Sequence, residues 1–242
     1  MTNCEICHKK NLFHMTQYWT GNQRWGQCRN CRHWQLEAPP QGLDLPPRVL
    51  YLDIERSLMS FWGYERKVIS GYISKECIRS EAFIICWAAC WIGETKIQSS
   101  CVTQNEALKN NDKRILQELW DLIDQSDYVT GHNVDKFDIK KLNNRFLIYE
   151  MGTPFGKSID TLKLARKHFP FDSNALAYIS KVLGGKPKKE INLNDWIRIV
   201  ETGDPAALQK SERYCRGDVR MGINVFNKFK KQIESRGTLL YK

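Results

Sequence analysis

Two carboxylates flank one apolar residue at the end of an apolar segment, residues 49–55. Successive side chains of a β-strand point to opposite faces, so Asp53 and Glu55 are predicted to share a face, with Ile54 on the other. Carboxylates this close repel each other, and one would stay protonated near neutral pH. A divalent cation between them removes the repulsion, and hard carboxylate oxygens suit magnesium or manganese. The segment therefore predicts a metal site on a strand.

Two further acidic residues stand where helices would present them. Asp138 is at the predicted start of a helix that follows a strand at residues 128–130. A carboxylate there either caps the helix or is aimed at a cation. Asp135 competes for the second role, but Asp138 is preferred because apolar neighbours on both sides would anchor it. Tyr214 and Asp218, four residues apart, share a face of a predicted C-terminal helix, where Tyr214 is either a core aromatic or part of the site.

Four cysteines near the N-terminus have zinc-ligand spacing. They form two Cys-x-x-Cys pairs, which suit a four-thiolate structural zinc site: Cys4 with Cys7, and Cys28 with Cys31. Cys7 followed by His8 also fits a haem-attachment pattern, but the second cysteine pair favours zinc. A module of residues 1–35 has too small a core to fold alone, so zinc would supply on the order of 10 kcal/mol of its folding free energy.

The same N-terminal module is basic and rich in aromatic residues. That mixture can hold phosphates and stack bases, although in a small module the tryptophans also serve as core. Residues 36–47 contain two proline pairs and no periodicity, which predicts a semi-rigid linker. The sequence is therefore predicted to divide into a zinc ribbon at 1–35, a linker at 36–47 and a larger domain at 48–242.

Composition limits the class of protein and its partners. The chain has 242 residues, with 37 Lys and Arg against 27 Asp and Glu, a formal charge of +10. This excess favours a polyanionic partner, nucleic acid first, over a merely solvated basic surface. No run of eighteen apolar residues occurs, and the N-terminus lacks the pattern of a signal peptide. We expect a cytoplasmic protein without a membrane partner, whose other five cysteines are thiols.

Hydrophobic periodicity predicts a mixed α/β larger domain. Strands are expected at residues 49–55, 83–92, 96–102 and 128–130. Residues 62–80 are polar and irregular, and an inserted hairpin is one interpretation of them that the sequence does not settle. Helices are expected at residues 115–127, 173–183 and 205–235, and another begins at residue 138. A short strand or turn at residues 158–162 is expected to lead into a further helix that ends at residue 168.

The order of these motifs resembles that of a known family. Asp53-x-Glu55, then Gly131-His132-Asn133 with Phe137-Asp138, then Tyr214-x-x-x-Asp218 resemble the three motifs of the DEDD, or DnaQ-like, superfamily of 3′–5′ exonucleases. The spacing to Tyr214 is that of the tyrosine subtype, since the histidine subtype would have His where Arg213 stands. The domain is similar to the proofreading exonuclease domain of family B DNA polymerases. One departure is Arg56, where relatives often have Thr.

The resemblance implies a fold and a set of roles. The fold would be ribonuclease H-like, a mixed sheet flanked by helices. Asp53, Glu55, Asp138 and Asp218 would hold two magnesium or manganese ions. Tyr214 would position the attacking water, and Asp135 and Asp160 are interpreted as structural. Met59 lies in an apolar stretch after the first motif that resembles the stretch packing against terminal bases in relatives, although such residues also serve as core; Asn133 is a further expected nucleic-acid contact. Independently of the resemblance, the basic loop residues Lys186, Lys188 and Lys189 either track a phosphate backbone or form a solvated loop.

The sequence leaves three functions to compare. The leading one is a metal-dependent 3′–5′ exonuclease that acts on single-stranded DNA ends and releases nucleoside monophosphates, with a separate polymerase or replication protein as a further partner. The second is an exoribonuclease, because two-ion cleavage neither requires nor excludes a 2′-hydroxyl. The third is a non-catalytic nucleic-acid-binding protein on a nuclease scaffold. The small size and ribbon fusion look like stand-alone relatives from phages and bacteria, which would place the protein in a host cytoplasm.

Overall fold

A computed structural model describes residues 18–20, 23–27, 34–37, 47–63, 73–169, 171–187, 190–235, 237 and 239–240. The N-terminal part contains a small antiparallel sheet in the order β1-β2-β3, formed by β1 (Tyr18–Thr20), β2 (Gln23–Gln27) and β3 (Trp34–Glu37). β3 thus includes the first two residues of the segment predicted as a linker. The four cysteines predicted to bind zinc lie outside the described residues.

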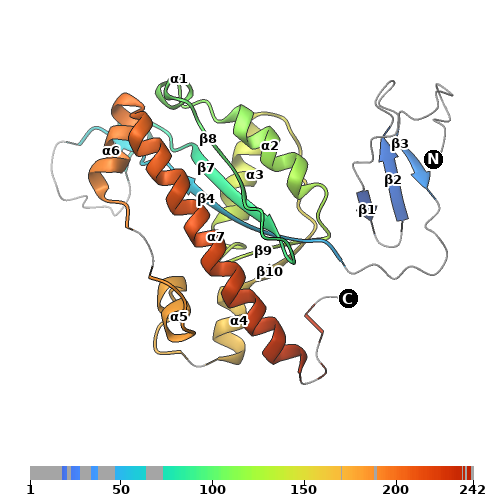
Figure 1. Ribbon diagram of the computed structural model, residues 1–242. Coiled ribbons are helices and arrows are strands. Elements are labelled where there is room, and N and C mark those ends of the chain that lie inside the picture. Colours follow the sequence, from blue (N-terminus) through green and yellow to red (C-terminus); the bar gives the residue numbers. More distant parts are fainter. Residues whose placement is uncertain are drawn as a thin grey trace.

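A five-stranded mixed sheet forms the centre of the larger domain (Figure 1). Its strands lie in the order β10-β9-β4-β7-β8; β10 and β9 run parallel to β4, whereas β7 is antiparallel to both β4 and β8. The strands are β4 (Val49–Arg56), β7 (Ile84–Trp91), β8 (Gln98–Cys101), β9 (Tyr128–Gly131) and β10 (Lys157–Asp160). The predicted mixed α/β class is confirmed.

The strand next to β4 is β7, and all eight of its residues are buried. Its sequence is nearly continuously apolar, as expected of a strand covered on both faces. Residues on alternate faces confirm this. The Sγ of Cys86 lies 3.7 Å from the Oγ of Ser211, whereas the indole Nε1 of Trp87 donates to the carbonyl oxygen of Ile115 at 2.7 Å. Different helices therefore cover the two faces of β7.

The long helix α7 (Pro205–Glu234) covers the face that carries Cys86 and crosses the sheet over β4 and β7 (Figure 1). It begins with Pro205 in its first turn, after the side chain of Asp204 accepts hydrogen bonds from the backbone N–H groups of residues 206 and 207, so the predicted start is confirmed. The opposite face is covered by α2 (Lys113–Ile123), which packs beside α3 (Asp138–Ile148).

Smaller elements surround this core. β5 (Ser60–Phe61) pairs with β6 (Ile78–Ser80), with a 3-10 turn η1 (Lys75–Cys77) before β6, so the first strand of this hairpin lies just before the range 62–80 in which a hairpin was expected. Helices α4 (Thr161–His168) and α5 (Leu176–Val182) pack against α7 and form a second apolar cluster. In that cluster Phe169 stacks on Phe229 with ring centroids 4.5 Å apart.

Several boundaries differ from the sequence prediction. α2 ends at Ile123 rather than near residue 127, and α5 begins at Leu176 rather than 173. Two short helices were not predicted, α1 (Gln104–Leu108) and α6 (Leu193–Thr202), although each starts with a capping box. Among the described helices, none is both long and apolar enough to span a bilayer.

Candidate metal centre

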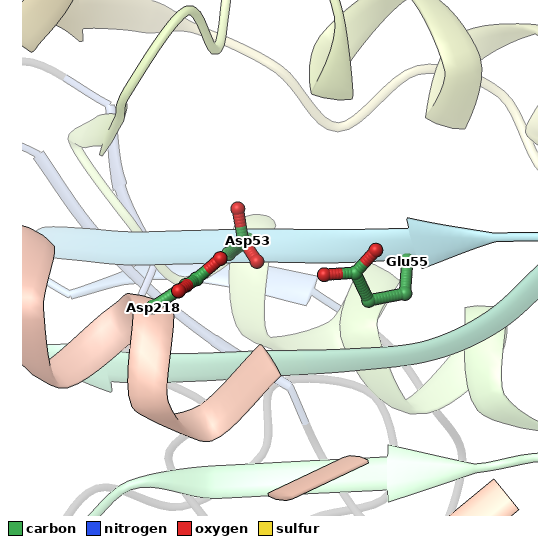
Figure 2. A group of neighbouring side chains, drawn as sticks. All are labelled: Asp53, Glu55 and Asp218. Carbon is green, nitrogen blue, oxygen red and sulfur yellow. The ribbon is translucent and has the colours of Figure 1, made fainter. Parts of the chain in front are cut away.

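Three carboxylates converge where α7 crosses β4. Asp53 and Glu55 project from the same face of β4, while Ile54 between them is buried and pairs with Trp87 of β7. Asp218 reaches them from α7, as Figure 2 shows. One carboxylate oxygen from each of the three lies within 4.8 Å of the others, a spacing that lets all three contact one cation. Strand alternation thus places the first pair, and a long-range helix contact adds the third.

Asp138 adjoins this cluster at the start of α3. Its side chain is 3% exposed, and its Oδ1 accepts a hydrogen bond from the backbone N–H of Ile54 at 3.1 Å. That N–H belongs to the residue between Asp53 and Glu55, so the start of α3 is fixed to the strand that carries these two carboxylates. The three-carboxylate group itself does not include Asp138. Asp138 acts on Asp53 through its charge.

Close approach of β9 to β4 makes this arrangement possible. Gly131 ends β9, and a Cβ there would lie 2.8 Å from the carbonyl oxygen of Leu52 and 3.0 Å from the Cβ of Val134. A larger residue would force the two strands apart. The Gly131-His132-Asn133 motif therefore begins with glycine because there is no room for a side chain between β9 and β4 at this position.

The loop from β9 to α3 is braced by Asp160. Its Oδ1 accepts hydrogen bonds from the backbone N–H of Asn133 and, as the N-cap of α4, from that of Leu162, both at 2.9 Å. Asn133 has a φ of 65°, a left-handed conformation that Asn tolerates. Asp135, the competing candidate, instead forms an ion pair of 2.6 Å with Lys163. Asp138 faces β4 while Asp160 holds the loop, the structural role predicted for Asp160.

Electrostatics show that the carboxylates fit a cation. Burial raises the pKa of Asp53 well above its ordinary value, and the charges of Asp138, Glu55 and Asp218 raise it further. Burial likewise raises the pKa of Asp138 to about 7, against the opposing effect of hydrogen bonds from backbone N–H groups. Clustered carboxylates that resist ionisation are stabilised in their charged form by a bound cation. The all-oxygen donor set suits magnesium or manganese.

Two neighbours on α7 complete the immediate surroundings. Tyr214 is half-buried and lies one turn before Asp218, as predicted from their spacing. Cys215 is fully buried, and its thiol lies 3.3 Å from the carbonyl oxygen and 3.5 Å from the Oδ2 of Asp53. From the sequence alone, Cys215 is expected only to be a thiol. No spacing motif marks it, because its contact with Asp53 spans 162 residues.

The residues predicted to contact nucleic acid are dispersed. Met59 is half-buried just after β4, next to a partly exposed apolar segment in which Trp62 is 67% exposed. The guanidinium carbon of Arg79 lies 5.3 Å from the centroid of the Trp62 ring, as in a cation–π contact. Lys186 is exposed after α5, and Lys188 and Lys189 lie outside the described residues. Among the described residues, Met59 directly follows the carboxylate-bearing strand β4, and Asn133 lies in the loop that leads to Asp138 beside it.

A solved structure of the family B DNA polymerase from the hyperthermophilic archaeon Pyrobaculum calidifontis is similar to this chain, with a TM-score of 0.55 and 18% sequence identity. The similarity covers 81% of this chain but only 26% of the polymerase, so the chain spans about a quarter of that protein's length. At this identity the likeness shows a shared fold. None of the curated proteins compared with the chain matches it.

A family model gives the assignment. Residues 76–230, more than half of the chain, match the model described as the RNase H superfamily. The matched region runs from η1 to the last turns of α7 and contains Asp138, Tyr214 and Asp218, while Asp53 and Glu55 lie just before it on the strand that pairs with β7. The mixed sheet with α7 across the carboxylate-bearing strand agrees with this match, and it supports a nuclease function: the chain belongs to the RNase H superfamily.

Proposed function

We propose that the protein is a metal-dependent 3′–5′ exonuclease that hydrolyses single-stranded DNA from its 3′ end and releases nucleoside monophosphates. One observation carries the proposal: oxygens of Asp53, Glu55 and Asp218 lie within 4.8 Å of one another, and Asp138 is bonded to the backbone between the first two. The formal charge of +10 supports a nucleic-acid substrate.

Each residue of the site has a defined task in this proposal. Asp53, Glu55, Asp138 and Asp218 would hold two divalent ions, which when bound stabilise the attacking and leaving oxygens of the displacement. Tyr214 would orient the attacking water by a hydrogen bond, since a phenol with an ordinary pKa of about 10 is a poor base at neutral pH. The thiol of Cys215 holds the carboxylate of Asp53 in place.

The test is digestion of a 5′-labelled single-stranded DNA oligonucleotide with magnesium or manganese, and with EDTA. We expect a ladder that shortens from the 3′ end, depends on metal and is absent in Asp53→Ala. Asp121→Ala is the matched control, because Asp121 is an exposed carboxylate on α2. Metal-independent cleavage, or full activity of Asp53→Ala, would refute the site.

The preference for DNA over RNA is tested in the same assay. A matched RNA oligonucleotide is digested in parallel, and we expect DNA to be cut faster. Faster cleavage of RNA would make the protein an exoribonuclease that uses the same residues. If neither polymer is cut with any divalent ion, the fold serves as a binding scaffold.

The N-terminal ribbon is proposed to bind one structural zinc ion and to help engage nucleic acid. The two Cys-x-x-Cys pairs of residues 4–7 and 28–31 support this. We expect one equivalent of zinc in the purified protein by elemental analysis, and its loss in a Cys4→Ser/Cys28→Ser double variant. Weaker DNA binding by that variant, with cleavage still metal-dependent, would assign the ribbon to substrate capture.

A further inference from the structure

A tyrosine and a glycine meet beneath the metal centre. Tyr51 is two residues before Asp53 in β4 and therefore on the same face, and its side chain is 1% exposed. Gly222 is four residues after Asp218 in α7 and therefore on the same side of the helix. A Cβ at position 222 would lie 2.7 Å from Cε1 of Tyr51 and closer still to its Cζ and Oη. Only a glycine lets α7 approach Tyr51 this closely.

This contact lies next to the contact between the carboxylates. Side chains two residues apart in a strand share a face, and side chains four residues apart in a helix share a side. The contact between Tyr51 and Gly222 is therefore next to the contact between Asp53 and Asp218 along the interface of β4 and α7. The separation of α7 from β4 at the first pair sets the separation at the second. At the second pair, oxygens of Asp53, Glu55 and Asp218 meet within 4.8 Å.

The tyrosine hydroxyl belongs to the same buried environment. Within the described residues its oxygen is buried without a hydrogen-bond partner, and the nearby hydroxyl of Thr161 donates instead to the carbonyl oxygen of Gly131 at 3.1 Å. Burial raises the pKa of Tyr51, and the charges of Asp53, Asp138 and Asp218 add to that effect. Tyr51 is thus buried close to three of the four acidic side chains, those of Asp53, Asp138 and Asp218.

The geometry points to Tyr51 and Gly222 as a positioning pair that sets the depth of α7, so that Asp218 can share a cation with Asp53 and Glu55. The inference rests on the metal site of the proposed function, but not on which nucleic acid is cut. Neither residue touches the cation. Both act through the placement of Asp218.

The first test measures manganese binding to the full chain by electron paramagnetic resonance, for wild type and Gly222→Ala. An added methyl group should push α7 away from β4, and we expect the dissociation constant for manganese to rise by about tenfold to a hundredfold, the usual range for losing a residue that orients a ligand. Gly217→Ala is the matched control: it lies in the same helix, and a Cβ there meets no atom within 4 Å. Its manganese affinity should equal that of wild type.

A compensating change tests the pair itself. Leucine at position 51 ends at Cδ and lacks the three tyrosine atoms that a Cβ at 222 would meet. We expect Tyr51→Leu/Gly222→Ala to bind manganese as tightly as Tyr51→Leu alone, and more tightly than Gly222→Ala. The comparison of the double variant with Tyr51→Leu holds even if Gly222→Ala alone fails to fold. A double variant weaker than Tyr51→Leu would overturn the inference, as would a Gly222→Ala protein of lower thermal stability with unchanged manganese affinity.

The outcomes separate this inference from the proposed function. A wild-type protein that binds manganese through Asp218, shown by loss of binding in Asp218→Asn, but cuts neither DNA nor RNA would refute the nuclease proposal, and the Gly222 series would still decide the positioning role. Manganese binding that Asp218→Asn leaves unchanged would overturn both.

Discussion

Two groups of buried carboxylates differ in how their charge is balanced. Asp112, 1% exposed at the start of α2, accepts hydrogen bonds from Arg145 at both oxygens, at 2.5 and 2.8 Å, and from the hydroxyl of Tyr149 at 2.9 Å. Asp53 and Asp138 at the metal centre take theirs from uncharged donors, a thiol and backbone N–H groups. The charge of Asp112 is balanced by the guanidinium of Arg145, whereas Asp53 and Asp138 fit a metal cation bound from solution.

The contrast supports the proposal that Asp53 and Asp138 belong to a cation site, and it favours a structural role for Asp112. A buried charge without a compensating partner is costly, and a folded chain supplies a side-chain cation where a position has only a structural role. At the metal centre, the free-energy cost of ionising Asp53 and Asp138 remains when no metal is bound, as the raised pKa values of these two residues show. Variants at the two places should therefore have opposite effects on stability and activity.

The largest effect is expected from Asp53→Asn. Losing a carboxylate ligand should lower cleavage by roughly four orders of magnitude, about 5 kcal/mol of transition-state stabilisation. Stability without metal should stay the same or rise, because one repelling charge is removed. Steady-state cleavage and thermal melting in EDTA measure the two effects. A variant that melts well below wild type in EDTA would erase the contrast with Asp112.

Arg145→Met should lower stability and leave the metal-dependent cleavage intact, the opposite of Asp53→Asn. It leaves Asp112 buried without its cation, a change that costs about 3–5 kcal/mol of folding free energy. Urea unfolding measures the loss, and cleavage by the folded fraction should keep its metal dependence. Lys163→Met is the control, because its pair with Asp135 has a lysine side chain that is 61% exposed, and such pairs contribute about 0–1 kcal/mol. Equal losses in both variants would contradict the structural role of Arg145.

Tyr214→Phe separates positioning from metal binding. Removing the hydroxyl that orients water should lower kcat by about tenfold to a hundredfold, the value of one hydrogen bond in the transition state. Manganese affinity should not change, since the four carboxylates remain. Single-turnover kinetics and manganese titration distinguish the two. A variant with wild-type kcat would assign Tyr214 to core packing.

The smallest effect is a pH dependence of stability. The folded-state pKa of Asp138 is raised to about 7 from an unfolded value of 3.8, so between these values the folded chain binds more protons than the unfolded one. In EDTA, this carboxyl should therefore make stability fall as pH rises through that window. A cation binds the ionised form, so the rise in melting temperature on adding manganese should be larger at pH 8 than at pH 5.5. Asp138→Asn should reduce both slopes; slopes identical to wild type would contradict the raised pKa.

Local patterns predicted most of the fold. The apolar run of β7, the alternation in β4 and the caps of α7 each depend on neighbouring residues, and the structure has all three elements near the predicted bounds. α1 was missed because it is only five residues long. α6 was missed although it has ten residues and its Asn192 and Asp195 capping box is readable in the sequence. The end of α2 was placed too late because polar residues 124–127 do not by themselves distinguish a last turn from a loop.

The site was predictable only where a motif is local. Asp53 with Glu55, and Tyr214 with Asp218, follow from strand and helix periodicity. The contacts of Cys215 with Asp53 and of Gly222 with Tyr51 depend on the position of α7 across the sheet, which is set by tertiary packing. No short-range spacing contains that information.

The long separation between β4 and α7 also orders events during synthesis. Asp53 and Glu55 leave the ribosome early, but the contact that joins α7 to Asp53 spans 162 residues, and such distant contacts form late. A nascent chain therefore carries Asp53 and Glu55 for most of its translation without Asp218, which completes the three-carboxylate group. The cell is exposed to the cutting activity proposed here only once the whole domain has been made and its last helix has docked.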